Sequence, residues 1–391
     1  MESRYKRLGN YIRMVDERNR DLTITNLQGV SISKQFVPSI ANIIGTDLST
    51  YKIVRTGQFA YGPVTSRNGD KISIALLNDR DCIISSSYIS FEVSKPDELF
   101  PEYLMLWFMR PEFDRYARYM SNGSAREVFD WDCMCGVELP VPPIDEQHKI
   151  VHDYKVISDR INILKKASEK LEAIINCFFI QTFFTNTQDE DLLEFEFGKY
   201  RPTSILSKTS EVVDVRDGTH DSPKAVLNGH KLITSIHLNP YSVNKEEAYA
   251  ISDHDYYEIN KRSCVNTGDI LMSMIGTVGR LSWVTDASVD YAIKNVALFK
   301  ASALSVEMRL YLLTYLKSDV VKKYLASFLA GSTQSYVSLS TLRSMPLVIP
   351  IETEIQQFAD AVAPMYTLLV KYEQEIHCLE KIGSSLYCPS V

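Results

Sequence analysis

The chain has 391 residues, of which 45% are hydrophobic and 23% charged, and its formal net charge at pH 7 is −7. A chain of this length predicts several structural units, and its negative charge excludes a protein that binds nucleic acid by bulk positive charge alone. No apolar run approaches the roughly 18 residues of a membrane span, and no apolar segment follows the charged N-terminus as in a secretory signal. Seven scattered cysteines, an odd number, indicate a reducing cytoplasm instead of a disulfide framework.

Residues 1–146 are predicted to form a first domain of the α+β class. Short β-rich runs such as "YKIVRTGQFAYGPV", "KISIAL" and "DCIISSSYISFEV" come first, separated by glycine and Asn-Gly turns. The helical pattern "PEYLMLWFMRPEFDRYARYM" follows. Strands therefore precede helices in this domain.

Residues 147–186 are predicted to form one long helix. Steps of four and three residues place apolar or aromatic side chains at eight of nine positions, which is typical of a coiled-coil seam. The nine positions are Ile150, Tyr154, Ile157, Ile161, Leu164, Ser168, Leu171, Ile175 and Phe178. Before this run, "LPVPPIDEQ" combines prolines, which favour extended backbone, with acidic residues suited to a first helical turn.

Residues 187–353 are predicted to form a second α+β domain, and residues 354–391 a second long helix. "DILMSMIGTVGRLSWV" and "YAIKNVALFKA" read as strands, and "VEMRLYLLTYLKSDVVKKYLASFL" reads as helix. In the second helix, Phe358, Val362, Met365, Leu369, Tyr372, Ile376 and Leu379 repeat the seam of the first. Pro364 lies inside this run and predicts a kink or a restart there.

The two halves form an internal repeat. At an offset of 208, "PPIDEQ" aligns with "PIETEI" and "GSAR" with "GSTQ"; at 211, "VRTGQ" aligns with "VNTGD". A period of this length indicates two copies of a domain followed by a helix. Because both seams are narrow and similar in length, we expect the two helices to pair antiparallel; the alternative is that each helix packs on its own domain.

Catalytic and cofactor motifs are missing from the sequence. It contains no G-x-S-x-G, H-E-x-x-H, Walker A or dinucleotide G-x-G-x-x-G pattern. His148 and His152 are four residues apart, but no third ligand is fixed beside them, so we expect a solvated surface there and no metal. "GTVGR" lies between strand-like segments and predicts a hairpin turn in preference to a phosphate loop.

Polar loops supply the candidate binding residues, because their side chains can hydrogen-bond base edges and phosphates. The bland alternative for each is an ordinary surface or turn residue. In the first domain the candidates are Ser31, Lys34, Tyr61, Arg67, Asn68, Ser87, Ser124 and Arg126. In the second they are Thr219, His220, Ser222, Lys224, Arg280, Lys294, Asn295, Gln334, Ser335 and Tyr336.

Three stretches carry a resemblance to a known family: "VRDGTHDSPKA" followed by "NTGDILMSMIGTVGR", "GVSISKQFVPSIANIIGTDLSTYKIVRTGQFA", and "LPVPPIDEQHKI". In them the chain resembles the specificity (S) subunits of type I restriction–modification systems. The first stretch looks like the start of that family's target recognition domains, the second resembles another class of these domains, and the third looks like the family's domain-to-helix junction. Together these motifs span nearly the whole chain.

The resemblance implies a non-catalytic, DNA-binding subunit with two target recognition domains, each reading half of a split target in double-stranded DNA. The helices would dock two adenine methyltransferase (M) subunits, which carry S-adenosylmethionine, and motor-nuclease (R) subunits would complete the enzyme. The rival hypotheses are a two-domain coiled-coil scaffold that does not bind DNA and a self-contained methyltransferase.

The first seam, Ile150 to Phe178, would be roughly 42 Å long at 1.5 Å per residue, and a turn of B-DNA is about 34–36 Å. We therefore expect half-sites roughly one turn apart, with the helices acting as a spacer. Inserting four residues near Lys165 should change the gap between half-sites, as read by mapping methylated adenines. An unchanged gap would contradict the spacer role.

Overall fold

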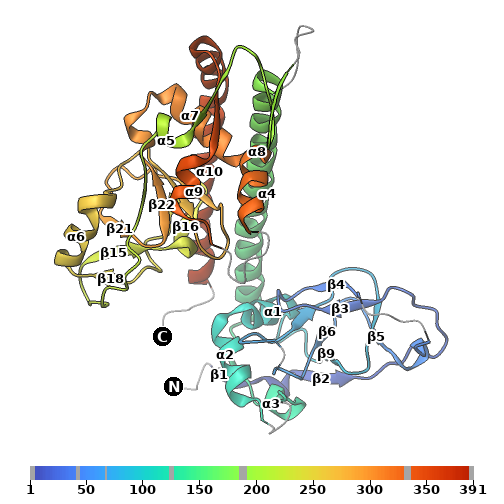
Figure 1. Ribbon diagram of the computed structural model, residues 1–391. Helices are drawn as coiled ribbons and strands as arrows, with labels where there is room; N and C mark the ends of the chain where they lie inside the picture. Colours follow the sequence, from blue (N-terminus) through green and yellow to red (C-terminus); the bar gives the residue numbers. More distant parts are fainter. Residues whose placement is uncertain are drawn as a thin grey trace. The chain divides into compact units, whose positions relative to one another are not determined.

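The computed structural model describes residues 5–40, 45–66, 68–122, 127–184, 192–329 and 336–386. Within them the chain forms two compact units, residues 5–160 with 379–386 (unit 1) and residues 161–378 (unit 2). Both units are mixed, with short strands and helices, and each strand-rich part is followed by a long helix (Figure 1). The predicted α+β class and the succession of domain and helix are confirmed.

Unit 1 is built on a four-stranded antiparallel sheet in the order β2 (Ile12–Val15), β9 (Ile89–Val93), β6 (Phe59–Tyr61) and β7 (Ile74–Leu76). Two strand pairs flank it, β3 (Gln28–Val30) with β4 (Phe36–Pro38) and β5 (Lys52–Val54) with β8 (Cys82–Ile84). The helices are α1 (Pro101–Met109), α2 (Pro111–Met120) and α3 (Trp131–Cys135). The sheet and these helices share one core, where Phe59, Phe91 and Phe108 are fully buried.

Unit 2 repeats this plan. Its main sheet has the order β14 (Val215–Asp217), β22 (Val296–Phe299), β19 (Ile270–Ser273) and β20 (Leu281–Trp283). Its helices include α5 (Thr209–Val212), α7 (Val306–Lys317), α8 (Asp319–Leu329) and α9 (Leu339–Ser344). Unit 2 adds a three-stranded sheet of β18 (Ala250–Ile251), β15 (His230–Ile233) and β21 (Tyr291–Ile293), with α6 (Asp253–Ser263) beside it (Figure 1). Short hairpins complete it: β11 (Leu193–Phe195) with β12 (Gly198–Tyr200), and β16 (Leu238–Asn239) with β17 (Ser242–Val243).

The sequence repeat has a structural cause at the aligned "RTGQ" and "NTGD" turns. Gly57 and Gly268 both have positive φ, at 88° and 93°, a conformation that glycine adopts without strain. The residue after each glycine then accepts the backbone N–H three residues back, Gln58 from Arg55 and Asp269 from Asn266, both at 2.8 Å. The turn therefore requires glycine and an acceptor side chain in both copies.

The two long helices are α4 (Ile144–Phe183) and α10 (Glu352–Leu386), and they pair antiparallel. In unit 2, the rings of Phe178 and Phe358 stack with centroids 5.8 Å apart. In unit 1, Cγ2 of Ile157 lies 3.7 Å from the place a Cβ on Gly383 would occupy. None of the sixteen predicted seam residues is exposed, so both seams and their antiparallel pairing are confirmed.

Both long helices also contribute to the core of the second domain. For α10 this is its own domain, as in the alternative, whereas α4 packs there on the domain that follows it. Phe179 and Phe183 of α4 are fully buried against Tyr311 of α7, with ring centroids 5.6 and 5.0 Å from it. Phe179 and Phe183 are not among the predicted seam positions. They join the helix pair and the second sheet into one core.

Pro364 does not divide the second helix. α10 runs without interruption from Glu352 to Leu386, so the predicted restart is wrong. Proline removes the hydrogen bond to the carbonyl four residues earlier, here that of Asp360. Pro364 and Asp360 are both exposed, which allows water to solvate that carbonyl.

The two helices begin at Ile144 and Glu352, slightly before the predicted domain boundaries at 147 and 354; the division into functional domains remains a prediction. No helix in the described part of the chain has the length and apolarity to cross a membrane.

Each long helix starts shortly after a two-stranded ribbon in which the last strand of the preceding domain pairs with a strand from near its start. β1 (Tyr5–Arg7) pairs with β10 (Glu138–Pro140), and β13 (Ile205–Lys208) pairs with β23 (Pro346–Ile349). In the first copy, Gln147 is fully buried at the helix start. Its amide accepts the N–H of Phe100 and donates to the carbonyls of Glu98 and Pro142, each at 2.8 Å. Gln147 thus connects the segment between β10 and α4 to the first turn of the helix.

A buried ion pair holds the β3–β4 hairpin of unit 1. Nζ of Lys34 lies 2.6 Å from Oδ1 of Asp114 on α2, and both side chains are almost completely buried. The backbone N–H of Ile72 donates to the same carboxylate at 3.1 Å. Burial lowers the pKa of Lys34, although Asp114 opposes that shift. Lys34 also has positive φ, which is uncommon for a residue with a side chain.

Replacing Gln147 with leucine should destabilise unit 1 by about 2 kcal/mol, because the N–H of Phe100 and two carbonyls lose their partner while the volume changes little. Urea unfolding of the full chain measures this. Gln357→Leu, at an exposed position in the first turns of α10, is the matched control and should be nearly neutral. Equal effects of the two substitutions would contradict the role of Gln147.

Lys34→Met should cost about 3 kcal/mol, because it leaves the buried Asp114 carboxylate without a counter-charge. The double variant Lys34→Met/Asp114→Asn should recover part of that loss, and unfolding of both variants gives the coupling energy. Lys6→Met, at an exposed lysine of the same unit, serves as the control. Additive effects at Lys34 and Asp114 would show that the pair does not stabilise the hairpin.

Candidate nucleic-acid interface

Five of the predicted residues come together in unit 2, in what we name the recognition-loop cluster: Thr219, His220, Ser222, Lys294 and Asn295. β14 ends at Asp217, and the chain then runs beside the tight connection between β21 and β22. The N–H of Thr219 donates to the carbonyl of Ile293 at 3.0 Å, and the N–H of Asn295 donates to the carbonyl of Thr219 at 3.1 Å. These bonds hold two separate loops side by side.

Backbone geometry explains the residues at this junction. A Cβ on Gly218 would lie 2.2 Å from the carbonyl oxygen of Ile293, so no side chain fits there. Asn295 has a φ of 53°, and asparagine adopts this left-handed conformation more readily than most residues. The approach of the two loops therefore depends on both residue types.

Charged and polar side chains connect the cluster to α6. The side chain of Asp217 is only 8% exposed and lies 3.0 Å from Nη2 of Arg262. Nη2 of Arg262 also donates to the carbonyl of Gly218 at 3.0 Å, yet 62% of its side chain remains exposed. Nε2 of His220 lies 3.0 Å from Oδ2 of Asp217, and Nδ1 lies 2.8 Å from Oδ1 of Asn295.

The remaining members of the loop are nearer to solvent. Lys294 donates to the hydroxyl of Ser222, and Thr219 accepts the N–H of Asp221 at 3.1 Å. Lys224 is exposed. The cluster thus offers ammonium, hydroxyl and amide groups within a few residues of each other, which are the groups that contact phosphates and base edges.

Arg280 and Tyr336 belong to a second group in unit 2, around the β19–β20 hairpin. "GTVGR" forms the connection of this hairpin, as predicted, and Ile275 makes a β-bridge with Tyr336. Arg280 is exposed, and 43% of Tyr336 is exposed. Arg280 borders a cavity of 670 Å³ whose other walls come from α4, α7 and α8.

A polar network starts from Glu172, Tyr241 and Lys317 in the wall of that cavity. Nζ of Lys317 lies 2.8 Å from both Oε1 of Glu172 and the hydroxyl of Tyr241. Glu373 of α10 accepts hydrogen bonds from the N–H of Tyr241 and the hydroxyl of Ser242. Burial raises the pKa of Glu373, whereas Lys317 outweighs burial and lowers the pKa of Glu172. The network joins α4, α7 and α10 to the β16–β17 hairpin.

The described candidates of unit 1 occupy three connections. Ser31 and Lys34 lie between β3 and β4, Asn68 between β6 and β7, and Ser87 between β8 and β9. Ser87 is exposed and its hydroxyl lies 3.1 Å from that of Ser85. Because Lys34 is buried in its ion pair with Asp114, its placement supports a structural role.

Tyr61 needs a correction. It points into the core from β6, its side chain has no exposed surface, and burial raises its pKa. The alternation of side chains along a strand placed it on the inner face, so a DNA contact by Tyr61 is not supported. Arg67, Ser124, Arg126, Gln334 and Ser335 lie outside the described residues, and for them DNA contact stays a prediction.

Sequence reasoning missed Asp217 and Arg262. Asp217 was visible in "VRDGTHDSPKA", where its burial could not be read, and Arg262 lies at the end of a helix that carries no motif. In the part of the chain that the structure describes, no group of three or more His, Cys, Asp or Glu side chains could hold a metal ion.

Comparisons with known proteins agree on one family. The sequence profile described as "Type I restriction modification DNA specificity domain" matches residues 39–173. The specificity subunit of the type I restriction enzyme MjaVIII from Methanocaldococcus jannaschii is 20% identical over 311 residues, covering 76% of this chain and 71% of that protein. The MjaIX specificity subunit from the same organism is 23% identical over 300 residues, covering 74% of this chain and 68% of that protein.

The fold agrees as well. The crystal structure of the type I restriction–modification S subunit from M. genitalium matches with a TM-score of 0.57 at 11% identity, covering 98% of this chain and 94% of that one. The arrangement of two domains and two long helices thus points to the same kind of protein as the sequence profile. In sequence and in fold, the chain is therefore similar to the specificity subunits of type I restriction–modification systems.

Proposed function

We propose that the two strand-rich domains each read one half of a split DNA target, and that α4 and α10 act as the spacer between the half-sites. The observation that carries this is the duplication: the main sheet has the same strand order in both units, and each domain ends in a ribbon followed by a long helix. The loops differ between the copies, as two half-sites of different sequence require.

The recognition-loop cluster supports a DNA contact in the second unit. Because the chain is acidic overall, the phosphates must be met by local cations such as Lys224, Lys294 and Arg262 and by groups from partner subunits. Several acidic side chains are already neutralised internally. Asp217 lies beside Arg262, and the fully buried Asp269 lies 2.5 Å from Nζ of Lys300.

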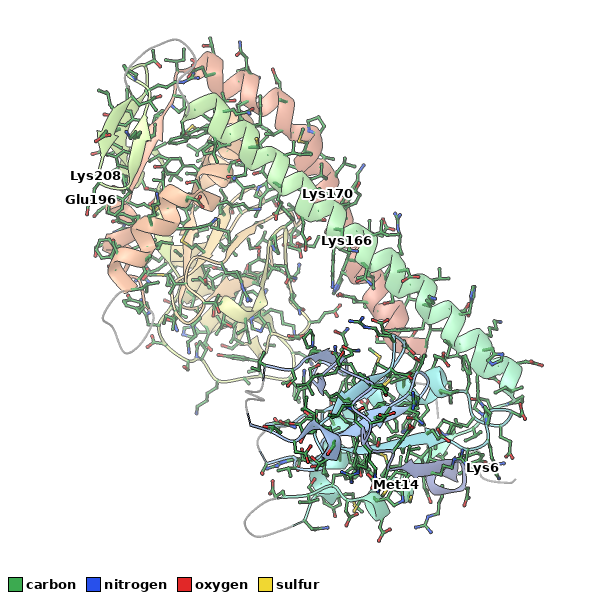
Figure 2. The ribbon with its side chains drawn as sticks, turned by 90° about the vertical axis from the view of Figure 1, so that its right-hand side faces the viewer. Lys6, Met14, Lys166, Lys170, Glu196 and Lys208 are labelled. Carbon is green, nitrogen blue, oxygen red and sulfur yellow. The ribbon has the colours of Figure 1, made fainter. Side chains whose placement is uncertain are left out.

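The partners in this proposal are two adenine methyltransferase subunits, which bring S-adenosylmethionine, and motor-nuclease subunits that complete a restriction enzyme in the cytoplasm. α4 offers a surface for such a partner. Ile163 and Ile174 are 59% and 51% exposed, and helical spacing puts them on one face with Ala167 and Lys170. Figure 2 shows Lys166 and Lys170 on this helix. Apolar residues flanked by lysines are suited to an amphipathic partner helix with acidic edges.

The function is tested by mapping methylated adenines in cells that express this chain with its methyltransferase, compared with cells that lack the chain. We expect methylation at one asymmetric motif of two half-sites separated by a fixed gap. A gel shift with the methyltransferase present addresses the scaffold alternative, which predicts no sequence-dependent retention of DNA. Methyl transfer by the purified chain alone would contradict a non-catalytic role.

Ile163→Glu combined with Ile174→Glu should weaken association with the methyltransferase subunit at least roughly tenfold, because charges would replace apolar contacts on α4. Co-purification and analytical ultracentrifugation measure this. Asn162→Glu adds a negative charge one position away and should have little effect, since Asn162 lies off the stripe. Unchanged assembly of the double variant would exclude this face of α4 as the docking surface.

A further inference from the structure

His220 is exposed, yet neither of its ring nitrogens is available to DNA. Nε2 lies 3.0 Å from Oδ2 of Asp217, and Nδ1 lies 2.8 Å from Oδ1 of Asn295. Only the C–H edge and the faces of the ring remain for contact with a ligand. The expected role of His220 as a base-reading side chain therefore does not fit this geometry, and the question becomes what His220 does to Asn295.

The side of His220 that faces Asp217 has a fixed polarity. A carboxylate oxygen only accepts hydrogen bonds, so Nε2 must carry a proton whether the ring is neutral or cationic. Arg262 places a positive charge beside the buried carboxylate of Asp217, with Nη2 3.0 Å from Oδ1. Arg262 on α6 and Asp217 on β14 are thus the charged groups that fix this end of the ring.

The side that faces Asn295 changes polarity with protonation. In the imidazolium, Nδ1 carries a proton and donates to Oδ1 of Asn295. In the neutral ring Nδ1 is a bare acceptor, and an oxygen at 2.8 Å would oppose its lone pair. Turning the Asn295 amide by half a rotation brings its NH₂ group to the same place with almost no change in shape.

The backbone of Asn295 does not need to move in this exchange. Its φ of 53° and its N–H bond to the carbonyl of Thr219 fix the main chain, so only the amide turns. The neighbouring Lys294, whose ammonium donates to Ser222, adds a positive charge on the same connection. Asp221 adds a negative charge in the loop that follows His220.

We propose that His220 is a positioning residue whose protonation state determines which group Asn295 offers to DNA, the amide NH₂ when His220 is cationic and the carbonyl oxygen when it is neutral. This rests on the proposed function. A donor at this place fits the acceptors of guanine or thymine in the major groove, and an acceptor fits the amino groups of cytosine or adenine. The base preferred at one position of one half-site then depends on pH.

The test uses the complex with methyltransferase and a duplex library with randomised half-sites, selected at pH 6.0 and at pH 8.0. We expect the preference at one position to change roughly tenfold between the two pH values, the discrimination of one good base contact. The other half-site is the internal control and should stay constant. His220→Gln, which does not titrate, should abolish the change, and His254→Gln on the exposed surface of α6 should keep it.

The outcomes separate the two proposals. No sequence-dependent binding at either pH would overturn the proposed function itself. Sequence-dependent binding with no pH-dependent preference, with a change in both half-sites, or with a change retained in His220→Gln would overturn the role of His220 and leave the proposed function standing.

A second measurement on the wild-type chain covers the case in which His220→Gln does not fold. Long-range ¹H–¹⁵N spectra of the chain with labelled histidine report which ring nitrogens are protonated for each of its seven histidines. The signals of His220 are assigned through its sequential backbone connectivities, and for this ring we expect a proton on Nε2 alone at pH 8.0 and on both nitrogens at pH 6.0. If His220 does not make this transition, or its neutral ring carries the proton on Nδ1, the proposal is wrong.

Discussion

Hydrogen bonding between the last strand of each domain and a strand from near its start is the constraint on which the architecture depends. The β1–β10 and β13–β23 ribbons bring the two ends of each domain together, so that the chain leaves each one next to the place where it entered. The ribbons also set the points at which α4 and α10 begin.

The seam between α4 and α10 adds apolar burial to that constraint. Leu164, Ile175, Phe358, Val362 and Leu369 are nearly or fully buried, and the same helices also contribute to the core of unit 2. Polar contacts supplement this packing without replacing it. Glu172 and Glu373, one from each helix, bind the β16–β17 hairpin through Tyr241 and Ser242. The second domain therefore packs on both helices, through apolar contacts and through hydrogen bonds.

The sequence predicted well those features whose pattern extends over many residues, and predicted poorly those that depend on the surroundings of a single residue. The seams and the duplication were predictable because a heptad repeat and a constant offset extend over many residues, and errors at single positions cancel. Tyr61, Lys34 and Pro364 depended on their immediate surroundings. Tyr61 lies near a turn but belongs to strand β6, which directs it into the core. Lys34 lies in a loop, but its buried partner Asp114 is 80 positions away in sequence. Pro364 is accommodated in α10 because it and Asp360 face water. His220 was identified as part of a functional loop, but its partners come from β14 and the β21–β22 connection.

The antiparallel helix pair has a consequence for how this chain reaches its native state. α4 and α10 form a helical hairpin whose connecting loop is a folded domain. Closing a loop of that length before its interior is ordered carries a large entropic cost, whereas the β13–β23 ribbon shortens the effective distance between its ends once unit 2 has formed. The strands of the second domain and the β13–β23 ribbon therefore bring α10 towards α4, and the core that both helices share with the second sheet closes in the same step. During synthesis α4 must accordingly wait, with its seam uncovered, until the last part of the chain has been made.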